Sequence, residues 1–428
     1  MNRSRTPYFF LGLAALIALT AIVVWRPRLA KRANHRLPED RSTSIPTTPA
    51  TPANTEKSPS PRTIEPNHYD PAALVAKIAK AIEDSDLDGL SLLIPKKLLD
   101  PATIDHLKQL STPPLRLRKT DPIREIGELE MNNHSRWALN LDGRNPGDDR
   151  IILDLRRIDG KWVVAKITLP IAGRNEFSQE KSVDSLGIAD GFLQAILKQD
   201  CESARRFADS ATISDAKLAA LCILFEEGHY RLRKSKPLRA IFQRDDTAGY
   251  LANVQSSDES ENAQIAMTLR HPTKDSAWIV SEINLDQLLA DYTKRIAGGD
   301  SYYTPLVRNP TGGDTLAIYF DFDQDQMTPR TRRQLEIVTR ILLSDPVKQI
   351  TLSGHTDALG TKDYNNGLSG RRASIVCEFL IKSGVAQNQI VMVANGDSQP
   401  RRPNVMENGK DNPEGRRANR RTEIYLDF

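Results

Sequence analysis

The chain has 428 residues, which is long enough for two to four domains. Hydrophobic residues make up 39% of the chain and aromatic residues 6%, which excludes a large bundle of membrane helices but allows ordinary hydrophobic cores. A net charge of +4 excludes a chain that is a polycation as a whole.

The first feature along the chain is an apolar run. Residues 1–7 are a short basic start, and residues 8–25 (YFFLGLAALIALTAIVVW) carry no charge. The run is about the minimum length for a membrane-spanning helix, and Tyr8 and Trp25 lie at its ends, where amphipathic rings prefer the headgroup level. A cleaved signal peptide also has a basic start and an apolar run, but no small-x-small site closes this one. The pattern therefore favours an uncleaved signal anchor, and without a following cysteine it excludes a lipoprotein.

Residues 26–68 are first basic and then rich in Pro, Ser and Thr. The second part has no residues for a core, so it predicts an extended spacer. Thirty residues at roughly 3.1 Å each in polyproline form reach on the order of 90 Å. The basic part conflicts with an external C-terminus, because the positive-inside rule would leave the bulk of the chain in the cytoplasm. Its cations are Arg26, Arg28, Lys31, Arg32 and Arg36.

Residues 69–175 and 183–296 predict two copies of one α+β unit. Each begins with a helical pattern and ends with a hairpin whose outgoing strand carries a tryptophan, Trp162 or Trp278. Helices followed by strands predict helices packed on a curved antiparallel sheet. The pattern resembles two tandem SnoaL-like cone domains. The short matches are Ala81-Ile82 with Ala195-Ile196, and Pro114-Leu115-Arg116 with Pro237-Leu238-Arg239.

Enzyme motifs are missing from the sequence of these two units. No HExxH, GxSxG or glycine-rich phosphate loop occurs, and the histidines (His106, His134, His229, His271) lack metal-ligand spacing. The two tryptophans fit core positions better than ligand platforms. We therefore expect no enzyme, no cofactor and no metal, and a role in spacing or in contacts with envelope proteins. An enzyme in the cone-like units is the lower alternative.

The three cysteines leave two readings open. Cys201, Cys222 and Cys377 are too few for a disulfide framework, and the number is odd. Three buried thiols are the favoured reading. A pair between Cys201 and Cys222 is the alternative if the compartment is oxidising.

Residues 297–313 predict a short linker, and residues 314–428 predict a two-layer α/β sandwich in the order β-α-β-α-β-β. Thr328 is placed as the N-cap of the first helix, followed by proline at the first helical position. The next strand ends at Gly354, and the second helix ends near Gly384. A long polar loop precedes the last strand. The expected fold class of the chain is thus a multidomain α+β protein with an N-terminal transmembrane helix.

Three motifs in the C-terminal part carry a family resemblance. They are FDFD at 320–323, GHTDALGTKDYNNGLSGRRASIVCEFL at 354–380, and GRRANRRTEI at 415–424. In this order and spacing they resemble OmpA-like peptidoglycan-binding domains, over about a quarter of the chain. The resemblance implies a domain that binds the stem peptide of the cell wall at its diaminopimelate residue.

The family's site residues fall on positions of this sequence. The resemblance implies Asp357 for the ammonium and Arg372 for the carboxylate of diaminopimelate. An arginine fork suits a carboxylate, and a carboxylate suits an ammonium. An alternative is that Asp357 and Arg372 pair with each other and only fix the loop. The further expected ligand residues are Asn365, Arg420, Asp321, Asp323 and Thr356.

Several charged neighbours are expected to be less important. Arg371 points about 100° away from Arg372 on a helix, so a solvated role is expected. His355 is expected to pack or hydrogen-bond at the strand end. Four arginines form either a solvated basic face or a contact with acidic wall polymers (Arg401, Arg402, Arg416, Arg417). Nucleic acid is not an expected partner, because no aromatic interleaving or recognition helix accompanies them.

Together these features predict a cell-wall anchor: a single-pass protein of the bacterial inner membrane whose C-terminal bulk lies in the periplasm. The runner-up is an envelope assembly or secretion-system scaffold whose residues 69–295 bind partner proteins. A MotB-like ion-driven stator is disfavoured, because residues 8–25 contain no acidic residue for ion relay. The sequence leaves the oligomeric state, the partner of the middle units and the chemistry of the wall peptide open.

Overall fold

The computed structural model describes residues 70–112, 114–144, 149–170, 183–257, 262–273, 276–296, 304–308 and 314–426. They form a mixed α/β structure with two sheets. The predicted N-terminus (1–7), membrane helix (8–25) and linker (26–68) lie outside the described residues. No helix in the described part of the chain is long and apolar enough to cross a membrane.

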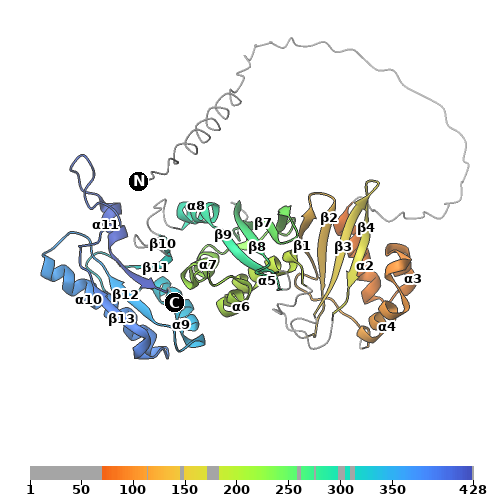
Figure 1. Ribbon diagram of the computed structural model, residues 1–428, viewed down its shortest axis with the longest axis horizontal. Helices are drawn as coiled ribbons and strands as arrows, with labels where there is room; N and C mark the ends of the chain where they lie inside the picture. Colours follow the sequence, from red (N-terminus) through yellow and green to blue (C-terminus); the bar gives the residue numbers. More distant parts are fainter. Residues whose placement is uncertain are drawn as a thin grey trace, which may run out of the picture. The chain divides into compact units, whose positions relative to one another are not determined.

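The first middle unit has three α-helices followed by an antiparallel meander of four strands (Figure 1). Each helix begins after an aspartate (Asp70, Asp86 or Asp100) whose carboxylate accepts a backbone N–H of the first turn. Apolar side chains of the helices and strands share one core. The elements are α2 (Pro71–Glu83), α3 (Leu87–Leu93), the 3-10 helix η1 (Lys96–Leu98), α4 (Pro101–Leu110), β1 (Ile123–Glu130), β2 (His134–Asn140), β3 (Arg150–Ile158) and β4 (Lys161–Thr168).

The second middle unit repeats this order of elements. Its first three helices begin after Asp184, Asp200 and Ser214, which stand at a constant spacing from the three N-caps of the first unit. That the two units are copies with a SnoaL-like fold stays a prediction. The elements are α5 (Ser185–Leu197), α6 (Cys201–Phe207), α7 (Asp215–Glu227), β5 (Arg231–Leu232), β6 (Leu238–Gln243), β7 (Thr247–Gln255), β8 (Asn262–Arg270), β9 (Ile279–Asn284) and α8 (Asp286–Arg295).

The two meanders join into one sheet, which the sequence did not predict. β1 pairs in parallel with β6 at Glu128 and Arg239, giving the order β4-β3-β2-β1-β6-β7-β8-β9, with β5 paired to β7. Gly127 permits the close approach, because a Cβ there would lie 2.6 Å from the carbonyl oxygen of Leu238. An ion pair also connects the two units where β1 meets β6, since Lys236 Nζ lies 3.2 Å from a carboxylate oxygen of Glu128.

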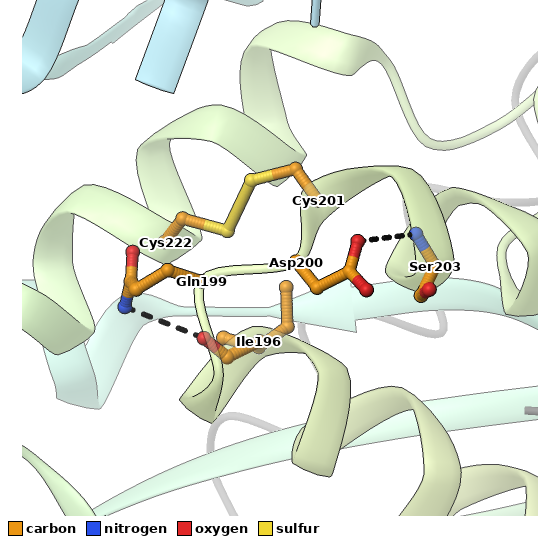
Figure 2. The surroundings of a disulfide bond; sticks show 6 residues. All are labelled: Ile196, Gln199, Asp200, Cys201, Ser203 and Cys222. Carbon is orange, nitrogen blue, oxygen red and sulfur yellow. Dashed lines mark hydrogen bonds between the residues drawn. A yellow bond between two sulfur atoms is a disulfide. The ribbon is translucent and has the colours of Figure 1, made fainter. Parts of the chain in front are cut away.

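A disulfide links Cys201 to Cys222, so the favoured reading of three buried thiols is wrong for these two residues (Figure 2). Cys201 opens α6 and Cys222 lies in α7, and the two helices pack against each other. This adjacency depends on tertiary packing, which cysteine spacing cannot show. Cys377 remains a buried free cysteine.

The C-terminal part is a two-layer α/β sandwich, and its sheet order is β10-β11-β14-β12-β13. Thr328 caps α9 as predicted. Two differences arise: β10 lies inside the predicted linker 297–313 because it pairs with β11, and α11 forms within the predicted long loop. The elements are β10 (Leu306–Arg308), β11 (Asp314–Tyr319), α9 (Pro329–Ser344), β12 (Ile350–Gly354), α10 (Lys362–Lys382), the 3-10 helix η2 (Gln387–Gln389), β13 (Ile390–Ala394), α11 (Pro413–Asn419) and β14 (Arg421–Tyr425).

The helices α9 and α10 bury apolar side chains against the sheet. Leu335 and Val338 of α9, Val376 and Leu380 of α10, and Ile424 of β14 are all buried in one core. Ion pairs also connect α9 to α7 of the second middle unit. Their partners are Arg330 with Glu227 and Arg333 with Glu226.

Candidate ligand-binding site

The close contact between β12 and α10 positions the candidate site. β12 ends at Gly354, and a Cβ there would lie 2.1 Å from the carbonyl oxygen of Ser369 in α10. Only glycine therefore lets the helix backbone lie so close to the strand end. Thr356 and Asp357, which follow shortly after this strand end, line the site beside the first half of α10.

A pocket of about 210 Å³ lies where the end of β12, α10, the loop after β11 and the start of β14 meet. Six of the seven predicted ligand residues line it: Asp323, Thr356, Asp357, Asn365, Arg372 and Arg420. The seventh, Asp321, does not line the pocket, but its backbone carbonyl accepts a hydrogen bond from Arg372. The sequence motifs thus predicted side chains that are spread over about 100 positions and that the fold brings together.

Asp357 is buried and lies against two arginines. Its Oδ2 accepts a hydrogen bond from Arg420 Nη1 at 3.0 Å and lies 3.8 Å from Arg416 Nε. Its Oδ1 accepts from the backbone N–H of Leu359 at 3.2 Å. These cations compensate the buried carboxylate in the absence of ligand.

Arg372 is fully buried and holds two backbone segments together, the loop after β11 and the end of β12. Its Nε, Nη1 and Nη2 donate to the carbonyl oxygens of Gln324 (2.9 Å), His355 (3.1 Å) and Asp321 (3.1 Å). Burial and the charge of Arg420 lower the pKa of Arg372 to about 10, so it stays charged at neutral pH. A guanidinium has five N–H groups, so two remain beyond these three bonds.

The alternative reading of a direct pair between Asp357 and Arg372 does not describe this site. In the described part of the chain the hydrogen-bonded cation of Asp357 is Arg420, and Arg372 bonds to carbonyl groups. Arg371 is exposed and pairs with Asp325 at 3.3 Å, which agrees with the solvated role expected for it.

Two buried polar side chains in the pocket have no hydrogen-bond partner among the described residues. They are Asn365, for both amide atoms, and Thr356, for its hydroxyl. Asn365 has no exposed surface. Buried polar groups are nearly always paired, so unpaired ones that line a pocket indicate a polar ligand or ordered water.

Sequence reasoning missed the apolar rim of the pocket. Phe322 and Tyr364 line it and remain largely exposed, with the Tyr364 hydroxyl donating to Asp323. The Arg420 guanidinium lies 5.9 Å from the centre of the Phe322 ring. The sequence FDFD could have indicated Phe322, because this aromatic residue lies between two acidic residues that were predicted to bind the ligand.

The arginines predicted as a basic face are only partly solvated. Arg416 pairs with Asp411 and approaches Asp357, Arg401 donates to the Tyr319 hydroxyl, and Arg402 pairs with Glu414. Arg416 therefore belongs to the surroundings of the pocket. These contacts were missed because they join residues of a loop whose path the sequence does not predict.

The pocket balances its charges. Asp323 and Asp357 oppose Arg372 and Arg420, and polar groups line the space between them. Such a lining suits a zwitterion better than an ion of one sign. Within the described residues, no group of three or more His, Cys, Asp or Glu side chains is placed to hold a metal ion.

His355 lies behind the pocket in a buried polar cluster. Neither ring nitrogen has a hydrogen-bond partner among the described residues, although its backbone N–H donates to the carbonyl of Arg421. Burial and the charge of Arg421 lower the pKa of His355 to about 4, against an opposing effect of Glu423. His355 therefore packs as a neutral ring, as one of the two expected roles requires.

The C-terminal part of the chain is similar to known proteins. Residues 319–414 match the model of the OmpA family. An 83-residue stretch is 34% identical to a peptidoglycan-associated lipoprotein from Pseudomonas aeruginosa, covering 19% of this chain and 49% of the relative. A stretch of 116 residues is 35% identical to the peptidoglycan-binding protein ArfA from Mycobacterium tuberculosis, covering 27% of this chain and 33% of the relative. The chain thus spans half or less of these curated relatives.

A solved structure also aligns with the C-terminal part. It is the peptidoglycan-associated lipoprotein from Burkholderia pseudomallei, at 30% identity, with a TM-score of 0.23. The alignment covers 25% of this chain and 86% of that structure. With this TM-score the alignment adds no weight to the site.

The buried histidine predicts an acid-sensitive stability. Between pH 6.5 and 4 the unfolded chain binds a proton that folded His355 does not, so stability falls as pH decreases through this window. The loss between pH 7 and pH 4 is about 3 kcal/mol. Urea unfolding at these two pH values should show a smaller loss for His355→Gln than for the unchanged chain. His106→Gln, on α4, is the control and should keep the full loss; equal losses in all three proteins would contradict the prediction.

Proposed function

Because residues 319–414 form a domain of the OmpA family, we propose that this chain binds peptidoglycan non-covalently through the pocket at the end of β12. The observation that carries the proposal is the charge-balanced pocket, in which the buried side chains of Asn365 and Thr356 have no hydrogen-bond partner among the described residues. The proposed role is that of a binding protein and not of an enzyme.

The proposed ligand group is the diaminopimelate of the stem peptide. It presents an ammonium and a carboxylate on one carbon, and the pocket offers both signs of charge at close range. Asp357 receives the ammonium and Arg372 the carboxylate. Both side chains are almost fully buried, and Arg420 is the cation that donates a hydrogen bond to Asp357. We infer that the ligand ammonium replaces Arg420 at Asp357, and that the released Arg420 joins Arg372 at the carboxylate.

We also propose that residues 8–25 anchor the chain in the bacterial inner membrane and that the C-terminal bulk lies in the periplasm. The support is the ligand itself, since peptidoglycan lies outside the cytoplasmic membrane. The disulfide between Cys201 and Cys222 also fits, because such bonds persist in oxidising compartments. The basic residues after the apolar run oppose this orientation.

Wall binding is tested by co-sedimentation of the purified full-length chain with isolated peptidoglycan. Asp357→Asn and Arg372→Gln should each weaken binding roughly ten-fold to a hundred-fold, because each leaves one charge of the ligand unpaired. Arg371→Gln is the matched control on the same helix and should bind like the unchanged chain.

Because Arg372 ties two backbone segments together through three carbonyl groups, circular dichroism must show that its variant is folded. Asp357→Asn keeps the shape of the side chain and therefore gives the cleaner comparison. Binding of equal strength by Asp357→Asn and Arg371→Gln would remove the site assignment, and no binding by the unchanged chain would remove the proposed function.

The orientation is tested by fusing alkaline phosphatase to the C-terminus. The enzyme is active only where its disulfides form, so the fusion should be active in intact cells if this end is periplasmic. Deletion of residues 8–25 from the fusion should abolish the activity. A full-length fusion that is expressed but inactive would sink the proposed orientation.

A further inference from the structure

A second pocket lies between the two middle units and is separate from the pocket at the end of β12. It has a volume of about 610 Å³ and is lined by residues before and at the start of β1, at and after the end of β2, at the start of β3 and at the end of α5. This volume falls in the range of small-molecule sites. Polar and charged side chains dominate it, which argues against an apolar ligand. Its cations are Arg118, Lys119, Arg124, Arg150 and Lys198.

Buried carboxylates hold the arginines of this pocket in place. Arg124 forms two parallel hydrogen bonds with Asp190, at 2.7 and 2.8 Å. Arg118 donates to Asp149. Both aspartates are at least nine-tenths buried, so they fix guanidinium groups that face the pocket. An array fixed in this way needs little reorganisation to receive an anion.

Arg150 stands between these two pairs and is poorly compensated. Its Nε lies 3.6 Å from Asp149 Oδ1, and its Nη1 lies 3.9 Å from Asp190 Oδ2. Both distances exceed those of good hydrogen bonds. Its side chain is 22% exposed, and its guanidinium makes no hydrogen bond to another side chain or carbonyl within the described residues. Three guanidiniums thus share two buried carboxylates, and the middle one has unused donors toward the pocket.

The remaining charged side chains near the pocket do not compensate the charge of Arg150. Lys119 and Lys198 add positive charge, while Asp121 and Asp142 on the lining are exposed. Exposed carboxylates are hydrated and contribute little to the stabilisation of the partly buried guanidinium of Arg150. An oxyanion inside the pocket can instead receive two N–H groups of Arg150 at once.

We propose that this pocket binds an organic oxyanion with at least two negative charges, carried by phosphate or carboxylate groups, and that Arg150 is its principal contact. Arg118 and Arg124 position the anion from either side, and Lys119 contributes at the exposed edge. Because the lining comes from both middle units, ligand binding there stabilises their seam. The proposal gives the middle units a ligand of their own, which the proposed binding of peptidoglycan does not.

Isothermal titration of the purified full-length chain tests the proposal with sodium pyrophosphate in one arm and sodium citrate in the other. Sodium chloride keeps the ionic strength equal, which separates binding from general charge screening. The unchanged chain should bind at least one of the two anions, and the preferred arm tells phosphate from carboxylate. Arg150→Gln should weaken binding at least ten-fold, and Lys119→Gln a few-fold.

The matched control is Arg157→Gln, an exposed arginine on the same strand that does not line the pocket. It should bind like the unchanged chain. Circular dichroism checks the fold of Arg150→Gln; if that variant is unfolded, the exposed Lys119→Gln decides. Binding of neither anion by the unchanged chain, or no weakening in the folded pocket variants, overturns the proposal.

Discussion

The buried guanidinium of Arg372 is the interaction on which the C-terminal site depends. It donates to carbonyl oxygens at the end of β12 and in the loop after β11, two segments that are far apart in the sequence. A charge without exposed surface is costly unless it is fully hydrogen-bonded. Here the backbone carbonyls supply that compensation, and they fix the walls of the pocket at the same time. Arg372 therefore shapes the pocket before it contacts any ligand.

The second constraint is the close approach of two backbone segments, which occurs at two glycines. Gly354 lets α10 lie against the end of β12, and Gly127 lets β1 lie against β6. The first contact brings Asp357 beside α10, and the second joins two meanders into one sheet. A charged pocket lies beside the first contact, and a second charged pocket is lined by residues of both middle units. The chain thus carries two polar sites that differ in net charge. In the C-terminal pocket the acidic and basic side chains balance, whereas in the pocket of the middle units the basic side chains are in excess.

Local signals in the sequence predicted local structure well. Thr328 before a proline predicted the start of α9, and Gly354 predicted the end of β12, because capping and strand termination depend on neighbouring residues. The family motifs also predicted six of the residues that line the C-terminal pocket. The sequence could not predict which cation compensates Asp357. Arg420 lies 63 positions later, and only the antiparallel pairing of β14 with β12 brings it there.

Other features stayed hidden for the same reason. The disulfide depends on the packing of α6 on α7, and the shared sheet depends on one parallel contact between two meanders. The unpaired state of Asn365 depends on burial, which a loop asparagine does not reveal in sequence. Patterns of neighbouring residues predict elements, whereas charge compensation and unsatisfied polar groups follow from tertiary packing.

The assignment of Asp357 and Arg372 to opposite halves of one zwitterion is tested most directly with three stem peptides. One is unmodified, one has the side-chain amine of its diaminopimelate acetylated, and one has the adjacent carboxylate amidated. Titration of each into the full-length chain should give measurable affinity for the first and a loss of at least ten-fold for both others, since each modification leaves one buried charge unpaired. Equal affinity for either modified peptide would contradict the assignment.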